Sequence, residues 1–539
     1  MAETKRRFAK LGRKLWGSVR ARPFDWAAGL VAVAACVYVI AYPFAVVRYP
    51  PMTDLPFHAS DISIFRHYWD SSFGFREQFT LHPFEVPYMS MYAIGALLAL
   101  VLPMHVAVKG AAVVMLALLP AGLALLFHGM KKSPLWGLLG LGAVWMHLTH
   151  WGFLNFVGAI GLFAMSVGYA LLVADRPTRW RQLGLALSLI AVFFTHHFRY
   201  PFAILAVWGA VVLVWPATRR LWPALWPTLP SVALFAAWHF MPKQGGKMDL
   251  GKHLAWSPDR VREIGAYLVD GFGGAAGVEE KLHFNRFLDL ALVLGISCAF
   301  WFVVQGRTKH RSFREWWWGA SVTLLPLLFA AGFLFAFLML PMRIGLWWYV
   351  YPREITPALF ILFAVVPDMP RAGLPRFALS LSLALFAGRM GYHVAVQYHA
   401  FDKSTADFQA VVAQIPKAPR LAYLIFNHEG STRTITPFIH LPAWVQAEKG
   451  GALSFHFIGW NQNPVAYREG SPHVPPPVPE HWEWRPTWFD VRRHGTWFDW
   501  FLVRRYADPA SIFAADPTIQ LVAHQDTWWL YRRRRPAPP

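Results

Sequence analysis

The sequence predicts a polytopic α-helical membrane protein of about eleven transmembrane helices, followed by a C-terminal soluble α/β domain. Hydrophobic residues make up 56% of the 539 residues and charged residues only 15%, and the mean hydropathy is +0.33. Apolar blocks long enough to span a bilayer alternate with short basic loops as far as about residue 394. After that point the apolar blocks stop, which places a domain boundary there.

Residues 1–25 form a basic N-terminal segment that precedes the first apolar run. That run is longer than the apolar region of a signal peptide, and no small-residue cleavage site follows it. We therefore expect a retained signal anchor with a cytoplasmic N-terminus. The formal net charge is +21, but Lys and Arg are scattered over loops and termini. This distribution suits insertion orientation and anionic membrane lipids, and it predicts no nucleic-acid partner.

The transmembrane domain is expected over 26–394, with a long external first loop at 48–104. A spanning helix needs about 20 apolar residues. The predicted spans are 26–47, 105–128, 134–150, 154–174, 183–198, 201–217, 223–241, 286–305, 317–341, 354–368 and 377–394.

The apolar stretch 91–103 is shorter than these spans and ends in a proline. Counting it as a twelfth span would place basic loops such as 176–182 and 307–314 on the outer side, which positive-inside statistics oppose. We therefore expect 91–103 to lie in the outer interface. The C-terminal domain, 395–539, then becomes external, and we expect a multi-pass protein of the bacterial inner membrane with this domain in the periplasm.

The C-terminal domain is predicted to combine helices and strands. A helix is expected at 404–415, strands at 420–427 and 498–506, a Pro-rich loop at 462–488 and a terminal hairpin at 519–535. The chain has no Walker loop, nucleotide-binding glycine fingerprint, CxxC or HExxH motif. ATP-driven transport and zinc-protease chemistry therefore lose most of their support.

Polar residues gather in the loops that this topology places on the outer face. The first loop contains "TDLPFHASDISIFRHYWD" at 53–70, with three aspartates and two histidines. Separate turns bring histidines to the same side, namely His147, His150, His196 and His197. Each alone fits interfacial hydrogen bonding. Together with Asp54 they predict a polar pocket at the outer leaflet, since ionisable groups at membrane depth are costly and usually line a cavity.

The chain resembles the GT-C superfamily of integral-membrane glycosyltransferases, whose familiar members include protein O-mannosyltransferases and aminoarabinose transferases. The resemblance lies in a single signal-anchor helix, an external loop that opens with Asp54, and "LHPFEVPYMSMYAIGALLALVLP" at 81–103. Further matches are "HWGFLNFVGAIGLFAMSVGYALLVADRPTRWR" at 150–181, "VYPREITPALFILFAVV" at 350–366 and the closing "WWLYRR". These matches cover the general plan of the whole chain, although each motif is short.

This resemblance implies inverting transfer of a sugar from a polyprenyl-phosphate or pyrophosphate donor to an envelope glycan, lipid or protein acceptor. Asp54 matches the acidic position of the family's first loop, where the carboxylate acts as base for the acceptor. The chemistry agrees, because an attacking hydroxyl needs a carboxylate within reach of its proton. An N-cap role for Asp54 is the alternative, since Asp before a Pro-containing helix start is ordinary capping chemistry.

The first loop also departs from the family pattern. Many relatives have Asp-Glu at this position, whereas Leu55 and Pro56 follow Asp54 here. A paired-carboxylate metal site is therefore in doubt, and the metal ligands and the need for a divalent cation stay open. His58 and Asp61 follow Asp54 by four and seven residues, so on a helix they share its face and are candidates to hold an ion or the sugar.

The leaving phosphate needs cations, preferably arginines, because a guanidinium makes forked contacts. Arg353 matches the family's entry to a late span, and Arg199 and Arg343 are also expected at the outer interface, where snorkelling to headgroups is the alternative. The full set of expected substrate-binding residues is His58, Asp61, His82, His147, His150, His196, His197, Arg199, Arg343 and Arg353.

Two other classes of function fit parts of the sequence. A transporter or flippase of a lipid-linked molecule would also have a polar outer pocket, but the sequence shows no inverted repeat or paired broken helices. A non-catalytic envelope assembly protein would use the external domain to bind a partner. A requirement for Asp54 in product formation separates the transferase from both alternatives.

Overall fold

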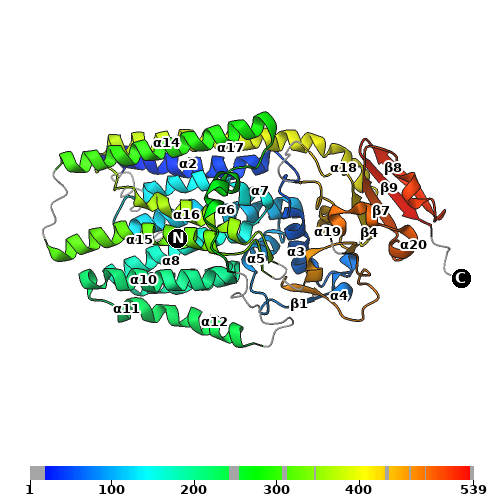
Figure 1. Cartoon of the computed structure of the whole chain (residues 1–539), viewed down its shortest axis with the longest axis horizontal. Coiled ribbons are helices and arrows are strands. Elements are labelled where there is room, and N and C mark those ends of the chain that lie inside the picture. The colour runs from blue at the N-terminus through cyan, green and yellow to red at the C-terminus, as the bar shows by residue number, and fades with distance from the viewer. Residues whose placement is uncertain are drawn as a thin grey trace, which may run out of the picture.

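Long helices dominate the chain before residue 404 (Figure 1). The computed structural model describes residues 19–241, 254–305, 312–344, 347–430, 436–460, 463–479 and 481–534. Within them, seven helical segments are long and apolar enough to cross a membrane: α2 (Pro23–Ala45), α6 (Met104–Gly129), α8 (Leu154–Asp175), η3 with α10 (His197–Thr218), α14 (Gly274–Val304), α15 (Phe313–Met339) and α17 (Gly373–Ser404). Most of the predicted N-terminal segment 1–25 lies outside the described residues.

The long helices pack side by side, with α2 against α17, α6 against α8, and α14 against α17. Helices α6 and α8 approach closely where Gly122 faces Gly161. A Cβ atom added to Gly122 would lie only 2.0 Å from the carbonyl oxygen of Gly161. Small residues at such contacts are typical of helix pairs in membranes, because they let the two backbones come close.

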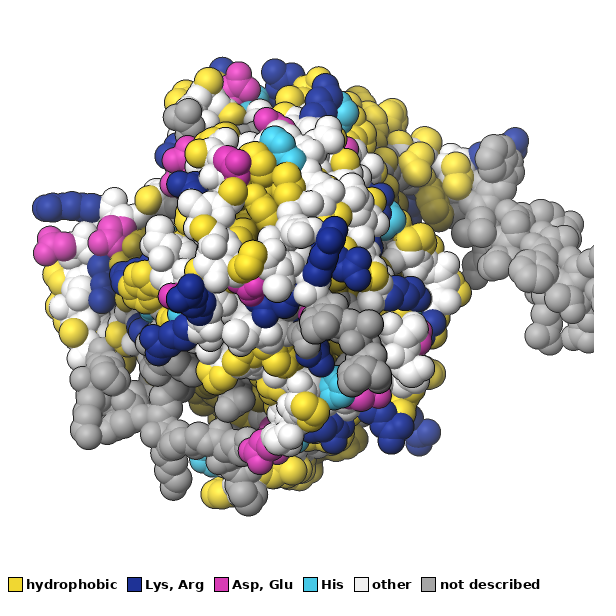
Figure 2. Space-filling model, turned by 90° about the vertical axis from the view of Figure 1, so that its right-hand side faces the viewer, with side chains coloured by type: hydrophobic (Ala, Val, Ile, Leu, Met, Phe, Trp, Pro, Cys, Tyr) yellow, Lys and Arg dark blue, Asp and Glu magenta, His cyan; other side chains and the backbone are white. Residues whose placement is uncertain are grey.

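The outer surfaces of several long helices are apolar. Leu30 of α2 is 72% exposed and Leu292 of α14 is 63% exposed, with other large apolar side chains around each. The end of the molecule that carries the C-terminal sheet is more polar than these helix surfaces. Several groups of Lys and Arg side chains lie there, with acidic side chains among them (Figure 2). Apolar sides and a charged end are what a membrane-spanning protein requires.

The predicted count of eleven spans is not confirmed. The predicted span 134–150 is divided into the 3₁₀ helix η2 (Pro134–Ala143) and the short helix α7 (His147–Trp151). The region predicted to span at 183–198 contains α9 (Arg179–Thr195). The region at 223–241 contains α11 (Trp222–Leu225), η4 (Trp226–Thr228) and α12 (Leu229–Phe240). The region at 354–368 contains α16 (Ile355–Leu362) and η8 (Phe363–Val365). Prolines stand in the first turns of η2, α11, η4 and α12, where the missing N–H costs no helical hydrogen bond.

The first loop is built from short elements. Helix α3 (Leu55–His67) is followed by η1 (Ser71–Phe73), α4 (Phe75–Gln78), β1 (Phe79–Leu81) and α5 (Ser90–Leu98). Helix α5 occupies most of the stretch 91–103 and has only nine residues. A helix of that length is too short to cross the hydrocarbon core.

The C-terminal region contains a five-stranded mixed sheet in the order β5-β4-β7-β9-β8. Its strands are β4 (Arg420–Ile425), β5 (Ala452–Leu453), β7 (Trp500–Arg504), β8 (Ile519–Gln525) and β9 (Trp528–Arg533). Strand β4 pairs in parallel with β5 and β7, and β7 and β8 pair antiparallel with β9. Helices α18 (Ala406–Val412), α19 (Ala443–Lys449), α20 (Val491–His494) and α21 (Ala510–Phe513) complete the region. The strands predicted at 420–427 and 498–506 and the terminal hairpin predicted at 519–535 are confirmed. The helix predicted at 404–415 is confirmed as α18.

The first loop and the C-terminal region are joined directly. Strand β1 pairs antiparallel with β6 (Val465–Tyr467), and α3 packs against α19. The Ser60 hydroxyl of α3 also donates a hydrogen bond to the Gln446 side chain of α19. These contacts bring residues from opposite ends of the sequence to one place, where the candidate site lies.

Candidate functional site

A cavity of about 490 Å³ lies where the first loop, the segment after α15 and the C-terminal region meet. Its walls combine charged groups with many aromatic rings. The lining residues are Asp54, His58, Tyr88, Tyr92, Trp151, Phe153, Arg343, Trp347, Trp348, Arg353, His440, Phe457, Trp460, Asn463, His481, Glu483 and Trp484. Four of the predicted site residues, Asp54, His58, Arg343 and Arg353, are among them.

Asp54 stands at the N-cap position of α3, but its side chain makes no capping hydrogen bond. Instead, its Oδ1 atom lies 3.3 Å from Nδ1 of His440, and the side chain is 13% exposed. The same His440 nitrogen lies 3.0 Å from the carbonyl oxygen of Thr53. A carboxylate that caps no helix and faces a cavity is available to accept a proton.

The backbone around Asp54 is held by the turn after α7. The Asp54 N–H donates to the Trp151 carbonyl over 3.0 Å, and the Thr53 N–H donates to the His150 carbonyl over 3.2 Å. Gly152 makes this approach possible, because its φ is +93° and an added Cβ would lie 3.1 Å from the Asp54 nitrogen. A side chain at Gly152 would therefore crowd the catalytic candidate.

His58 lies one helical turn after Asp54 and also lines the cavity. Its Nδ1 atom is 3.0 Å from the Tyr92 hydroxyl, and its Nε2 atom is 3.2 Å from the carbonyl oxygen of Gly152. A carbonyl can only accept, so Nε2 donates to Gly152 and the Tyr92 hydroxyl donates to Nδ1 in the neutral ring. Burial lowers the pKa of His58, which favours that neutral form.

Asp61 lies behind the lining residues, among buried side chains. The Nδ2 atom of Asn463 donates to its Oδ2 atom over 2.8 Å, and Nε2 of His456 is 4.0 Å from its Oδ1 atom. Burial raises the pKa of Asp61 to about 7. Asp61 does not line the cavity, but it is hydrogen-bonded to Asn463, which does.

Arg353 presents its guanidinium to the cavity from η7 (Tyr351–Glu354). Its Nε and Nη2 atoms donate to the carbonyls of Tyr349 and Trp348 over 3.0 Å each, and its Cζ atom lies 4.1 Å from the centre of the Phe153 ring. Arg343 lines the same cavity from β2 (Arg343–Ile344). The cavity therefore holds two arginines besides the carboxylate of Asp54.

The remaining predicted residues lie outside this lining. Arg199 forms a buried, forked ion pair with Glu354, so its charge is already balanced within the protein. His82 lies 3.5 Å from Glu85, His150 lies 3.6 Å from Glu280, and His196 packs its ring against Tyr88. His147 accepts from the indole N–H of Trp151 and donates to the Asp270 carbonyl, and His197 packs against Trp238 and Trp347.

Sequence reasoning missed the contribution of the C-terminal region. His440, Asn463, His481, Glu483 and Trp484 all line the cavity, and none stood out in the sequence. His440 is separated from Thr53 by 387 positions. No local pattern carries information about a contact over that distance, so only the tertiary structure could identify these residues.

Comparison with known proteins gives one clear result. No family model matches the sequence, and no curated protein matches it. Among solved structures, the chain is similar to the crystal structure of ArnT from Cupriavidus metallidurans bound to undecaprenyl phosphate, with a TM-score of 0.51 and 12% sequence identity over 93% of this chain and 97% of ArnT. The resemblance seen in the sequence is thus confirmed at the level of the fold, because the chain has a fold like that of ArnT.

Proposed function

We propose that this protein is an inverting glycosyltransferase that moves a sugar from a polyprenyl-phosphate carrier to an acceptor of the cell envelope, at the outer face of the bacterial inner membrane. One observation carries this proposal. The chain has a fold like that of ArnT, and one cavity is lined by both Asp54 and Arg353. The Asp54 carboxylate makes no capping hydrogen bond to α3. A glycosyl transfer needs a base and a cationic phosphate site in such proximity.

Asp54 acts as the general base. Its carboxylate takes the proton of the acceptor hydroxyl as that oxygen attacks the anomeric carbon. Attack from the face opposite the phosphate inverts the configuration at that carbon. His440, whose Nδ1 atom lies 3.3 Å from Oδ1 of Asp54, keeps the carboxylate oriented toward the cavity.

Arg353 and Arg343 hold the donor phosphate, whose negative charge grows as the bond to the sugar breaks. Two backbone carbonyls fix the guanidinium of Arg353, so little side-chain freedom is lost when phosphate binds. The rings of Trp347 and Trp348 beside them offer apolar faces for the sugar or the first isoprene units. The crystal structure of ArnT with undecaprenyl phosphate supports a polyprenyl carrier as the donor class.

His58 and Asp61 support the sugar-binding side of the cavity, His58 directly and Asp61 through Asn463. The other predicted residues, from His82 to Arg199, act as supports for the walls. The N-terminus is cytoplasmic and the C-terminal region, 395–539, is periplasmic in this proposal. That orientation puts the cavity where lipid-linked sugars are presented to envelope acceptors.

The replacement Asp54→Asn tests the proposal. Asn serves an N-cap as well as Asp does, so folding should survive, while loss of a positioned base should lower the transfer rate about a hundred- to ten-thousandfold. Asp70→Asn is the matched control, since Asp70 does cap η1 through the Ser72 N–H over 3.0 Å. It should keep nearly normal activity.

The measurement uses the lipid that copurifies with the wild-type protein. Mass spectrometry should identify a polyprenyl-phosphate sugar, and its loss of sugar in the presence of envelope acceptor gives the rate for each variant. An Asp54→Asn protein that retains the lipid and transfers at the normal rate contradicts the proposal. So does wild-type protein that moves the lipid across vesicles with its sugar-phosphate bond intact, which would identify a flippase.

A further inference from the structure

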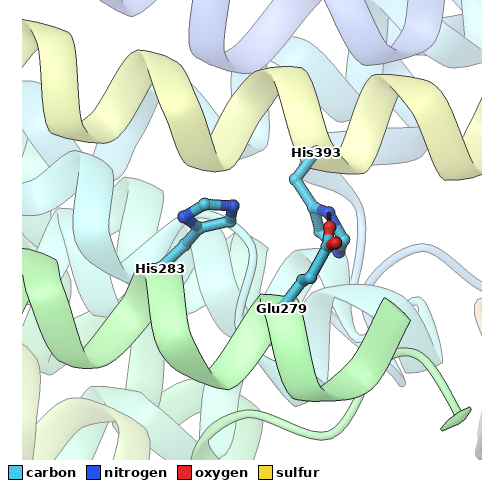
Figure 3. Close-up of side chains that lie close together, drawn as sticks. All are labelled: Glu279, His283 and His393. Atoms are coloured by element: carbon cyan, nitrogen blue, oxygen red, sulfur yellow. Dashed lines mark ion pairs between the residues drawn. The ribbon is translucent and has the colours of Figure 1, made fainter. Parts of the chain in front are cut away.

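Three metal-ligating side chains converge between α14 and α17, outside the cavity described above (Figure 3). Glu279 and His283 lie one turn apart on α14 and point toward His393 of α17. One ligand atom from each residue lies within 4.8 Å of the other two. We propose that these residues bind a Zn²⁺ ion that clips α14 to α17.

The distance between Glu279 and His393 fits tetrahedral coordination. Nδ1 of His393 lies 3.3 Å from Oε2 of Glu279. In a tetrahedral zinc site with bonds of about 2.0–2.1 Å, neighbouring ligand atoms are about 3.4 Å apart. His283 shares a helix face with Glu279, and a ligand atom of its ring lies within 4.8 Å of both other ligand atoms, so its ring would turn toward the bound ion.

The second nitrogen of His393 supports the assignment. Its Nε2 atom lies 3.0 Å from the carbonyl oxygen of Ala276, and a carbonyl only accepts, so Nε2 carries a proton. In a neutral ring Nδ1 is then an acceptor that faces a carboxylate, so either a second proton on the ring or a metal ion must lie between the two atoms. A hydrogen bond from the other ring nitrogen to a carbonyl is also the usual partner of a metal-bound histidine.

The donor set points to zinc. Imidazole and carboxylate ligands suit Zn²⁺, and two histidines with one glutamate leave a fourth position for water. The two histidines are buried, whereas the Glu279 side chain is 65% exposed. That open side gives the ion an entry path and a place for the water ligand.

Zinc at this position would stabilise a wall of the cavity. Glu280, the next residue on α14, accepts hydrogen bonds from the N–H groups of Gly271 and Phe272 and lies 3.6 Å from Nε2 of His150. The His150 carbonyl in turn accepts from Thr53, beside Asp54. The clip would thus act on the wall of the cavity, and it does not depend on the proposed transferase activity.

The test uses full-length protein without a polyhistidine tag, stripped with EDTA and then titrated with Zn²⁺. Elemental analysis should find about one Zn²⁺ per chain, and Zn²⁺ should raise the unfolding temperature. Glu279→Gln, at an exposed position, should weaken binding at least about tenfold and abolish the thermal shift. His399→Ala is the control, because His399 is an exposed histidine on the same helix.

Co²⁺ provides a second readout, since ligation by these residues should give tetrahedral Co²⁺ absorption in wild-type protein and in His399→Ala but not in Glu279→Gln or His393→Ala. Asp54→Asn should bind Zn²⁺ as wild type does, which separates this site from the transferase proposal. If wild-type protein binds no Zn²⁺ after stripping, the inference is overturned. A proton, and not a metal ion, would then lie between Glu279 and His393. Binding that persists in Glu279→Gln, His283→Ala and His393→Ala would also overturn it.

Discussion

Arg353, the proposed ligand of the donor phosphate, is held in place by the protein backbone. Hydrogen bonds to the carbonyls of Tyr349 and Trp348 use two of its five N–H groups, which leaves others to reach a phosphate. Arg353→Ala should weaken donor binding about ten- to a hundredfold, as expected for a charge-assisted hydrogen bond. Arg353→Lys should recover only part of that loss, because an ammonium group cannot make a forked contact.

Donor binding by these Arg353 variants can be measured by retention of the copurified lipid during exchange with empty detergent micelles. Unchanged retention in Arg353→Ala, with normal folding, would remove Arg353 from the phosphate site. A parallel loss of lipid and of thermal stability would indicate a structural role for the guanidinium against Phe153.

Asp61 makes the stability of the site depend on pH. Burial raises its pKa from 3.8 to about 7, so between those values the folded protein binds more protons than the unfolded protein does. Stability contributed by the protonated form is therefore present at low pH and is lost as the pH rises toward 7. The Asn side chain in Asp61→Asn cannot ionise. The unfolding temperature of this variant should therefore rise relative to that of wild type as the pH is raised from about 5 to about 8. A difference that does not change with pH would show that Asp61 does not titrate in this range.

The turn after α7 determines where α3 begins, and Gly152 is its critical residue. Gly152→Ala places a side chain at φ +93° and within 3.0 Å of the Leu55 nitrogen. Positive φ alone costs about 1–3 kcal/mol for a residue with a Cβ, and the crowding should push Asp54 from its position. We expect lower thermal stability and a larger fall in transfer rate.

Gly209→Ala in α10 is the matched control for Gly152→Ala, because no atom lies within 4 Å of the added Cβ. Alanine is the better helix former, so this variant should be as stable as wild type or slightly more so. Equal effects of the two replacements would show that the turn tolerates a side chain, and the position of Asp54 would need another explanation.

The local sequence pattern predicted the strands of the C-terminal sheet more accurately than it predicted the membrane-spanning helices. The apolar run at 420–425 and the terminal hairpin are strands as expected, because a short run of apolar residues suits a buried strand. The segment 134–143 is equally apolar, yet it is a 3₁₀ helix packed on α6. A Cβ on its Gly140 would lie 2.8 Å from the Cα atom of Pro120, so close packing decides its conformation, and hydropathy does not report packing.

The orientation of the whole molecule can be tested by labelling. In a background with Cys36→Ala and Cys298→Ala, single cysteines would be introduced at two exposed positions, Tyr506 in the C-terminal region and Arg179 at the start of α9. We expect an impermeant maleimide to label Tyr506→Cys but not Arg179→Cys in intact spheroplasts, because basic loops stay in the cytoplasm. Labelling in the opposite sense would place the C-terminal region in the cytoplasm and remove the proposed site from the outer face.

The sequence by itself determined that this is a helical membrane protein with a mixed C-terminal region, since composition and hydrophobic periodicity are local properties that the bilayer and the sheet select directly. It also singled out Asp54, His58, Arg343 and Arg353. Only the tertiary structure decided that these four share a cavity with His440 and the other C-terminal side chains. The physical reason is that β1–β6 pairing and the packing of α3 on α19 join segments almost 400 positions apart, and contacts at such a distance follow from how the whole chain packs.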